Sequence, residues 1–309
     1  MADKMATREA YGKTLVELGG IYDNLIVMDA DLSGSTKSGE FRKAYPERFF
    51  NMGIAEQDLY GAAAGLAISG KIVCASTFAM FAAGRAFEII RNSIGYTGAN
   101  VKICATHAGI TVGEDGASHQ TFEDIALMRT IPGMTIVNPS DGASAEILLK
   151  QVIAMDGPAY VRLGRAAVPF IYDADADLKL GKGNVIREGK DITVVVTGIM
   201  VNEAVMAADI LAAEGISTRI IDIHTIKPID EELIIKAARE TGAIVTAEEH
   251  SVIGGLGSAV AEVTARNCPV KMAMVGQNDT FGESGKPEEL KKKYHMTAED
   301  IVAAVRSLL

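Results

Sequence analysis

Two histidines, His107 and His119, flank an acidic and glycine-rich stretch that contains Glu114 and Asp115. The whole chain has five histidines, so two of them share this short segment. An apolar run, residues 101–105, leads directly into it and is typical of a buried strand. In open α/β sheets, ligands bind in loops that follow the carboxyl ends of strands. The segment therefore predicts a polar binding or catalytic loop, although two surface histidines in a turn would also fit the pattern.

One acid and two aromatic residues form a second candidate group. Glu56 begins a predicted helix, residues 56–69, whose glycines and alanines allow another backbone to approach closely. An acid in the first turn is favoured by the helix dipole, and capping alone would explain Glu56. Phe78 and Phe81 follow the next predicted strand and are either core residues or the walls of a slot for a flat ring. A carboxyl beside such a slot could share a proton with a ring nitrogen.

The elements that must position these residues alternate between strand-like and helix-like segments. This alternation predicts an α/β fold, with two three-layer α/β/α domains whose mostly parallel sheets are covered on both faces. The predicted strands cover residues 24–28, 71–76, 101–106 and 135–137, then 192–197, 217–222 and 243–248. Predicted helices include residues 56–69, 81–96 and a segment ending at residue 154 that Ser140 or Asp141 could cap.

The alternation breaks between residues 165 and 191, where a proline, several acidic residues and three glycines occur. This composition is typical of a linker between domains. We therefore predict a first domain at residues 1–168, a linker at residues 169–190 and a second domain at residues 191–309.

Composition excludes several classes of function. The 309 residues carry a net charge of −10, which argues against a general nucleic-acid binder. No apolar run approaches the roughly 20 residues that span a bilayer, and the N-terminus lacks the apolar run of a secretory signal. Three scattered cysteines make neither a disulfide framework nor a metal spacing. The sequence therefore predicts a cytoplasmic protein that contacts neither nucleic acid nor membrane and has no metal site of its own.

Four motifs in one order carry a resemblance to the transketolase family. They are Gly53-Ile-Ala-Glu-Gln57, Thr77-Phe-Ala-Met-Phe81, Thr106-His107 with Gly113-Glu-Asp-Gly-Ala-Ser-His-Gln120, and Ile131-Pro-Gly-Met-Thr-Ile-Val-Asn-Pro-Ser-Asp141. The resemblance covers the whole chain but only the second half of a full-length transketolase, which comprises the pyrimidine-binding and C-terminal domains. The signature of the family's diphosphate-binding domain, Gly-Asp-Gly followed later by asparagine, is not found. The chain therefore resembles the C-terminal subunit of a split, two-chain transketolase.

The resemblance implies thiamine diphosphate as cofactor. Glu56 matches the catalytic glutamate that hydrogen-bonds N1′ of the pyrimidine ring and favours the tautomer able to accept the C2 proton. Phe78 and Phe81 match the aromatic residues that pack on this ring. A third aromatic residue of the family falls at Gly84, so a looser slot is expected. Asp31 and Leu32, after the first predicted strand, match residues near the thiazolium.

The resemblance also implies substrate contacts. His107, Asp115 and His119 match residues that bind the hydroxyls and phosphate of the sugar substrates, with Asp115 selecting the configuration at the donor C2 hydroxyl. A cluster at the channel mouth would bind phosphate, because an arginine fork bonds phosphate oxygens bidentately. The residues that match this cluster are Arg8, Ser35 and Arg165, with Arg162 close enough in sequence to take the place of Arg165.

The function implied by the resemblance is transfer of a two-carbon ketol unit from a ketose phosphate to an aldose phosphate. An N-terminal transketolase subunit would share the thiamine diphosphate and hold most of the Mg²⁺ or Ca²⁺ site. Self-association of two such pairs would give an α2β2 assembly, and in this family the C-terminal domain serves mainly the dimer.

Two alternatives remain open from the sequence. The β subunit of a 2-oxo-acid dehydrogenase has the same layout, but lacks the pattern that stands at residues 113–119. A non-catalytic scaffold with a thiamine-diphosphate fold is the second alternative. The retained acid Glu56 and the two histidines of the loop argue against it.

Overall fold

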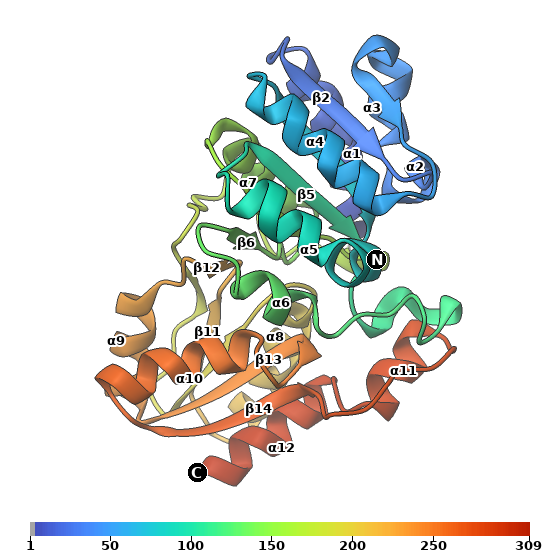
Figure 1. Ribbon diagram of the computed structural model, residues 1–309. Helices are drawn as coiled ribbons and strands as arrows, with labels where there is room; N and C mark the ends of the chain where they lie inside the picture. The colour runs from blue at the N-terminus through green and yellow to red at the C-terminus, as the bar shows by residue number, and fades with distance from the viewer. Residues whose placement is uncertain (1–3) are drawn as a thin grey trace.

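The larger sheet of the computed structural model contains the strands that lead to the candidate residues. The structure describes residues 4–309. Within this range the sheet has seven strands in the order β12–β6–β7–β5–β4–β2–β3 (Figure 1). All neighbours pair in parallel except β12, which is antiparallel to β6. The strands are β2 (Leu25–Asp29), β3 (Phe49–Asn51), β4 (Ile72–Phe78), β5 (Val101–Thr106), β6 (Thr135–Val137), β7 (Ala159–Arg162) and β12 (Thr225–Lys227).

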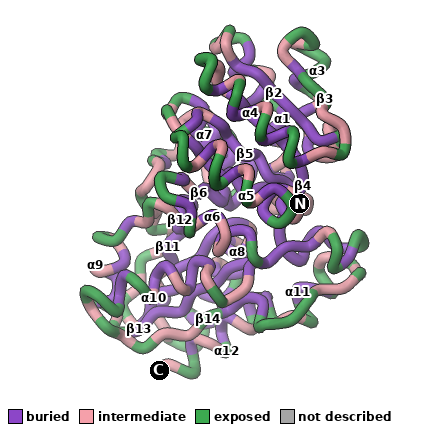
Figure 2. The backbone as a smooth tube through the Cα atoms, in the orientation of Figure 1, coloured by how far each residue is buried: buried purple, intermediate pink, exposed green. Residues whose placement is uncertain are grey.

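Helices cover both faces of this sheet. Alternate side chains of a strand point to opposite faces, and here both sets are apolar and need to be buried. Leu25 and Val27 of β2 pack with α1 and α7, whereas Ile26 and Met28 pack with α4 and α6 on the other face. Figure 2 shows that the central strands are buried and that exposed residues lie on the outer turns. The helices of this half are α1 (Thr7–Gly19), α2 (Ser33–Thr36), α3 (Gly39–Ala44), α4 (Glu56–Ile68), α5 (Phe87–Ile89), α6 (Asp124–Arg129) and α7 (Gly142–Ala154).

A second sheet of five strands in the described chain has the order β14–β13–β10–β11–β9, and only β9 is antiparallel to its neighbour. Helices α8 and α12 pack on one face, and α9 and α10 on the other. None of the helices within residues 4–309 has the length and apolar content to cross a membrane. The elements are β9 (Asn184–Arg187), β10 (Ile192–Val196), α8 (Met200–Ala213), β11 (Thr218–Asp222), α9 (Glu231–Thr241), β13 (Ala243–Ser251), α10 (Leu256–Asn267), β14 (Lys271–Gln277), α11 (Pro287–Lys293) and α12 (Ala298–Leu308).

The predicted α/β class with mostly parallel sheets is confirmed, with one local difference. The helix predicted over residues 81–96 consists of two π-helical segments, η2 (Phe81–Arg85) and η3 (Ile90–Gly95), on either side of the short α5. Such wide turns are uncommon and occur often at functional sites. Gly84 lies inside η2, and glycine weakens a regular α-helix by about 1 kcal/mol relative to alanine. Of the two candidate caps of α7, Asp141 is the one that accepts the N–H of Ser144, at 2.7 Å.

The two halves of the chain exchange elements. β12 lies far beyond the predicted linker in sequence, yet it completes the first sheet through β6. β9 falls within residues 169–190 and joins the second sheet. Near the start of the described chain, β1 (Lys4–Ala6) pairs with β8 (Ala167–Pro169). The division into residues 1–168, 169–190 and 191–309 stays a prediction.

A buried ion pair lies where the two sheets meet. Arg162 of β7 donates from Nε and Nη2 to the carboxylate of Asp124 on α6, at 2.8 and 3.3 Å. The same Nη2 donates to the backbone carbonyl of Glu249 on β13, at 2.9 Å. Tyr160 adds a third donor to Asp124 at 2.8 Å. Both ions are desolvated, so they depend on these partners to remain charged inside the protein.

A buried carboxyl holds the connecting segment at the same junction. Asp222, at the end of β11, accepts hydrogen bonds from Ser140 and from the hydroxyl of Tyr172. Its Oδ1 atom has no hydrogen-bond partner. Burial raises the pKa of Asp222 to about 7. Asp222 therefore links the start of α7, the segment after β8 and the second sheet.

We expect Arg162→Met to lower the free energy of unfolding by about 3–5 kcal/mol, because it leaves Asp124 charged, buried and unpaired. Adding Asp124→Asn should recover part of this loss, since the uncompensated charge is removed. Urea unfolding of the three variants measures both effects. Arg187→Met is the matched control, because its pair with Asp209 is largely exposed and worth no more than about 1 kcal/mol. A loss at position 162 no larger than the control's would contradict the assigned role.

The Asp222 carboxyl predicts a pH dependence of stability. Its pKa is about 7 in the folded chain and about 3.9 in an unfolded one. Its contribution to stability is therefore fully present below about pH 4 and is lost as the pH rises through 7. Asp222→Asn removes this titration, so the variant should gain stability relative to the parent chain between pH 5 and pH 8. Urea unfolding measures the difference in the free energy of unfolding between the variant and the parent chain. The same difference at pH 5 and at pH 8 would refute the prediction.

Candidate active site

Glu56 begins α4 and is buried although it is ionisable. Only 1% of its surface is exposed, and its Oε2 accepts a 2.8 Å hydrogen bond from Nη1 of Arg85, a half-exposed residue. The chain enters α4 through a turn in which Gly53 has a φ of +73°, a conformation that glycine adopts without strain. The bond from Arg85 to Oε2 leaves Oε1 as a second acceptor.

An aromatic wall lies beside Glu56. Phe78 ends β4 and Phe81 begins η2, and their rings stack with centroids 6.0 Å apart and planes 13° apart. The guanidinium of Arg85 lies 4.8 Å from the centroid of the Phe81 ring. A Cβ atom at Gly84 would lie 2.6 Å from Cε of Met80. Met80 therefore fills the space beside the position where a third aromatic residue was expected.

His107 stands at the end of β5 and joins this wall. Its ring stacks on Phe78 at 3.8 Å between centroids. Its Nε2 lies 3.3 Å from Nη1 of Arg8, and its Nδ1 lies 2.9 Å from the hydroxyl of Thr106. Because a guanidinium can only donate, Nε2 is the acceptor. Burial, with the charges of Arg8 and Arg165, lowers the pKa of His107 to about 3, so the ring is neutral near pH 7.

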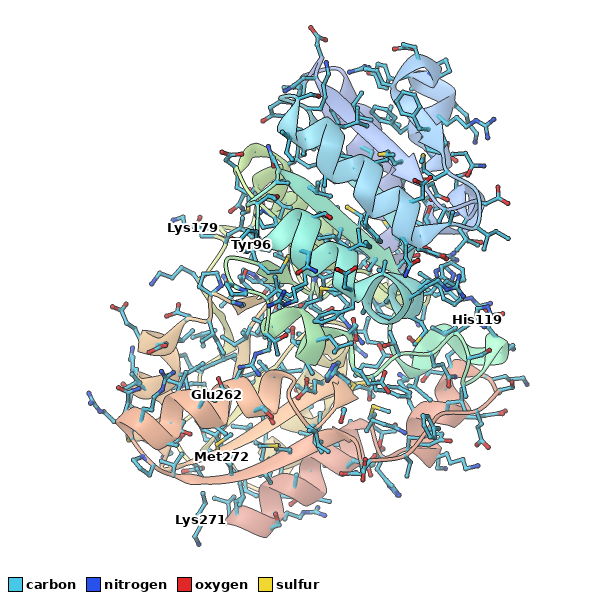
Figure 3. The ribbon with its side chains drawn as sticks, in the orientation of Figure 1. Tyr96, His119, Lys179, Glu262, Lys271 and Met272 are labelled. Carbon is cyan, nitrogen blue, oxygen red and sulfur yellow. The ribbon has the colours of Figure 1, made fainter. Side chains whose placement is uncertain are left out.

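The loop after His107 brings the second histidine to the same wall. The edge of His119 faces Phe81 and Phe78, with centroids 5.4 and 6.2 Å apart. Its Nδ1 lies 3.0 Å from the hydroxyl of Ser118. Figure 3 shows His119 on the side of the molecule where the loop passes close to α11. Asp115 lies on the same loop and is exposed.

Arginines lie near the two histidines, and the two candidates Arg162 and Arg165 have different partners. Arg162 is buried in the pair with Asp124, whereas Arg165 donates from Nη1 to the carbonyl of Val112 and to Glu114, at 2.7 and 2.9 Å. Arg8 donates from Nη1 to the backbone carbonyl of Ser35 at 2.7 Å. The backbone N–H of Glu114 and the Arg165 guanidinium lower the pKa of the Glu114 carboxyl. Of the arginines considered for the phosphate cluster, Arg8 and Arg165 therefore lie beside the loop.

The loop after β2 is held by residues that the sequence analysis did not select. Asp31 has a φ of +65°, and it exchanges hydrogen bonds with the side chain of Asn51, at 3.0 and 2.8 Å. The carboxylate of Asp29 accepts from the N–H of Leu32 and from the hydroxyls of Thr36 and Ser38, at 2.7 and 2.8 Å for the hydroxyls. Burial raises the pKa of Asp29 to about 6. An aspartate at a strand end before a serine- and threonine-rich loop was the available signal.

In the second half of the chain, the glycine run 254–257 and His224 already have hydrogen-bond partners. The glycine run 254–257 begins α10, but Glu248 already accepts the N–H groups of Leu256 and Gly257, at 2.7 and 2.8 Å. His224 is buried between Thr225 and Asn184, and burial lowers its pKa to about 4. Within residues 4–309, no group of three or more histidine, cysteine or acidic residues is arranged to hold a metal ion.

The residues that come together suit a flat nitrogen heterocycle. Glu56 offers a buried carboxylate acceptor beside the stacked rings of Phe78 and Phe81, which provide an apolar surface. His107, stacked on Phe78, and His119, whose ring lies against Phe81 and Phe78, add ring nitrogens that can donate or accept hydrogen bonds. An aminopyrimidine matches this set, because its ring nitrogen can bond a carboxyl while its faces pack on aromatic rings.

Comparisons with known proteins agree with this arrangement. The family model for the transketolase pyrimidine-binding domain matches residues 3–170, and the model for the transketolase C-terminal domain matches residues 181–301. Members of this family use thiamine diphosphate. The chain spans about half the length of human transketolase, to which it is 37% identical over 313 residues.

Shorter relatives match along their whole length. A Methanocaldococcus jannaschii chain, named as a transketolase C-terminal section, is 52% identical over 301 residues, which are 96% of this chain and 94% of that one. A 6-deoxy-6-sulfo-D-fructose transketolase subunit of a Clostridium species is 42% identical, over 97% of this chain and 94% of that one. A solved split-gene transketolase, described as an inactive β4 tetramer, is 57% identical with a TM-score of 0.93, covering 99% and 98% of the two chains. The chain therefore belongs to the transketolase family and is a transketolase C-terminal section of the kind found in split enzymes.

Proposed function

We propose that this chain is the C-terminal subunit of a two-chain transketolase that moves a two-carbon ketol unit from a ketose phosphate to an aldose phosphate. The observation that carries the proposal is the buried carboxylate of Glu56 beside the stacked rings of Phe78 and Phe81. When bound, thiamine diphosphate supplies the carbon nucleophile and the electron sink for this chemistry. Glu56 would hold the proton shared with N1′ of the pyrimidine, and the two phenylalanines would orient the ring.

The remaining candidate residues divide between cofactor and sugar. Asp31 and Leu32 would lie beside the thiazolium, on the loop that Asp29 and Asn51 hold. The neutral His107, with His119 and Asp115, would bind the sugar hydroxyls. Arg8, Ser35 and Arg165 would bind the terminal phosphate. One relative is named for the sugar phosphate apulose 4-phosphate and another for 6-deoxy-6-sulfo-D-fructose, which carries a sulfonate, so no single preferred sugar is proposed within the sugar phosphates.

An N-terminal transketolase subunit would complete the site. It would bind the diphosphate and hold the Mg²⁺ or Ca²⁺, because residues 4–309 offer no cluster of acids, histidines and cysteines for a metal ion. Two such pairs would form an α2β2 assembly. The name of the solved relative, an inactive β4 tetramer, supports the view that this type of chain needs a second one for activity.

The proposal also includes a cytoplasmic location and the domain boundaries. The cysteines Cys74, Cys104 and Cys268 are all free, as expected for the cytoplasm. Residues 1–168 would form the pyrimidine-binding domain, 169–190 the linker and 191–309 the C-terminal domain.

Reconstitution tests the proposed function. The chain should show no ketol transfer from xylulose 5-phosphate to ribose 5-phosphate alone, and transfer should begin when an N-terminal transketolase subunit, thiamine diphosphate and Mg²⁺ are added. Transfer by the chain alone, or none by the complex, would contradict the proposal.

In the reconstituted complex, we expect Glu56→Ala to slow hydrogen–deuterium exchange at C2 of the cofactor by at least about 100-fold, the usual scale of a lost proton-transfer group. Proton NMR measures this exchange directly. Asp58→Ala is the matched control, because Asp58 lies in the same first turn of α4 and is exposed. Exchange in the Glu56 variant within a few-fold of the control would remove Glu56 from this role.

We expect Arg85 to oppose cofactor binding slightly, so that its replacement makes binding tighter. Its guanidinium lies over Phe81 and on Glu56, where the pyrimidine would pack, so it must give up both contacts. Arg85 is half exposed although Glu56 is buried, and a pair screened on one side is worth about 1 kcal/mol, so Arg85→Met should lower the half-saturating thiamine diphosphate concentration by about fivefold. Titration of cofactor fluorescence quenching measures it, with Arg91→Met as control. Weaker binding in the variant would show that Arg85 helps to hold the cofactor instead.

A further inference from the structure

The loop that carries Asp115 and His119 is held by the second half of the chain. We call residues 110–120 the substrate loop and residues 282–287, which follow β14 and end with the first residue of α11, the clamp. Figure 1 shows the substrate loop lying against α11, although the two are far apart in sequence. Neither segment belongs to the sheet of the other, so their contact is a separate structural link between the two halves.

Gln120 is the central contact between the two segments. Only 3% of its surface is exposed. Its Nε2 donates to the carbonyl of Glu283 in the clamp at 2.9 Å, and to the carbonyls of Ile110 and Gly113 at 3.4 Å. One amide therefore joins the beginning, the middle and the end of the substrate loop to the clamp. Losing the amide would remove this link to the Glu283 carbonyl, whereas the Gly113 carbonyl would keep the N–H of Gly116 as a donor at 3.1 Å.

Glycines on both segments permit this close approach. A Cβ atom at Gly282 would lie 1.9 Å from Oε1 of Gln120, which is closer than any real contact. A Cβ atom at Gly116 would lie 2.4 Å from the hydroxyl oxygen of Ser284, and Gly116 has a φ of +75°. A Cβ atom at Gly113 would lie 3.2 Å from the ring of Pro287. At these three places a glycine of one segment thus lies close to a side chain of the other, and an added Cβ atom would be crowded.

A strand of the second sheet, β13, holds the beginning of the substrate loop. Glu249 on β13 is buried, and its Oε1 accepts the N–H of Thr111 at 2.7 Å. A Cβ atom at Gly109 would lie 2.2 Å from the carboxyl carbon of Glu249. Arg162 bonds the backbone carbonyl of the same residue. The junction ion pair and the substrate loop therefore share one anchor residue.

We infer that the C-terminal domain positions the substrate-binding residues, with Glu249 and the clamp fixing the shape of the substrate loop. This inference rests on the proposed function of Asp115 and His119. Gln120, Gly282 and Ser284 touch neither sugar nor cofactor in this scheme; they are positioning residues. Displacement of the substrate loop by about 1 Å would be enough to lower catalytic efficiency by about 100-fold. The C-terminal domain would then serve the substrate site as well as the dimer.

Gly282→Ala tests the clamp in the reconstituted two-chain enzyme. The backbone of Gly282 lies outside the left-handed region, so the added methyl group acts through its collision with Gln120. We expect kcat/KM for ketol transfer to fall by about 10- to 100-fold, with the KM values for both sugars raised. Exchange at C2 of the cofactor should stay at the parent rate, because Glu56 is held by Arg85 of η2 and not by the clamp.

Gly285→Ala is the matched control. It makes the same substitution in the same segment, but its Cβ would lie near the side chain of Leu290 on α11, at 2.9 Å, and near no residue of the substrate loop. We expect nearly parental kinetics. A second variant, Gln120→Ala, removes the amide without adding bulk, and should also lower kcat/KM. Adding Gly282→Ala to Gln120→Ala should cost less than about twofold more, since residues in contact give non-additive effects.

Amide hydrogen exchange of the full chain alone provides a readout that does not depend on activity. Residues 111–120 should exchange faster in Gly282→Ala and Gln120→Ala than in the parent chain, and at the parental rate in Gly285→Ala. Parental exchange and parental kinetics in Gly282→Ala would overturn the inference. A complex without any ketol transfer would instead overturn the proposed function, and exchange would still decide the role of the clamp. If Gly282→Ala does not fold, Gln120→Ala carries both measurements.

Discussion

The structure depends on the buried contact of Arg162 with Asp124 and with the backbone of Glu249. One guanidinium joins a strand of the first sheet, a helix on its face and a strand of the second sheet. Because charges inside a protein are costly unless their partners are well placed, this arrangement tolerates little change in the relative position of the two sheets. Because this junction holds the two sheets in place, the substrate loop of the first half can stay in contact with Glu249 and the clamp of the second half.

The candidate site uses this rigidity in two ways. Strands β2, β4 and β5 end at the same edge of the first sheet, and their loops bring Asp31, Phe78 and His107 to one side of the molecule. The second half supplies no catalytic candidate, yet it supports the substrate loop through Glu249 and the clamp. In the proposed function, this chain would therefore provide half of the cofactor site and most of the residues that bind the substrate.

Sequence reasoning predicted what depends on local pattern. The α/β class, the start of α4 at Glu56 and the strand that ends before His107 follow from periodicity, caps and apolar runs, and the structure confirms them. The sequence could not predict that Arg85 is the partner of Glu56, because the position of Arg85 depends on the π-helical turn of η2. The choice of Arg165 over Arg162 and the contact of Gln120 with the clamp were equally inaccessible, since they arise from residues 38 to 163 positions apart.

The location of the cofactor tests the central claim most directly. A crystal structure of the two-chain complex with thiamine diphosphate should place an oxygen of Glu56 about 2.7–3.0 Å from N1′ of the pyrimidine, with the ring packed on Phe78 and Phe81 and the Arg85 guanidinium displaced. A complex in which Glu56 keeps its bond to Arg85, while the pyrimidine binds at another surface, would contradict the account.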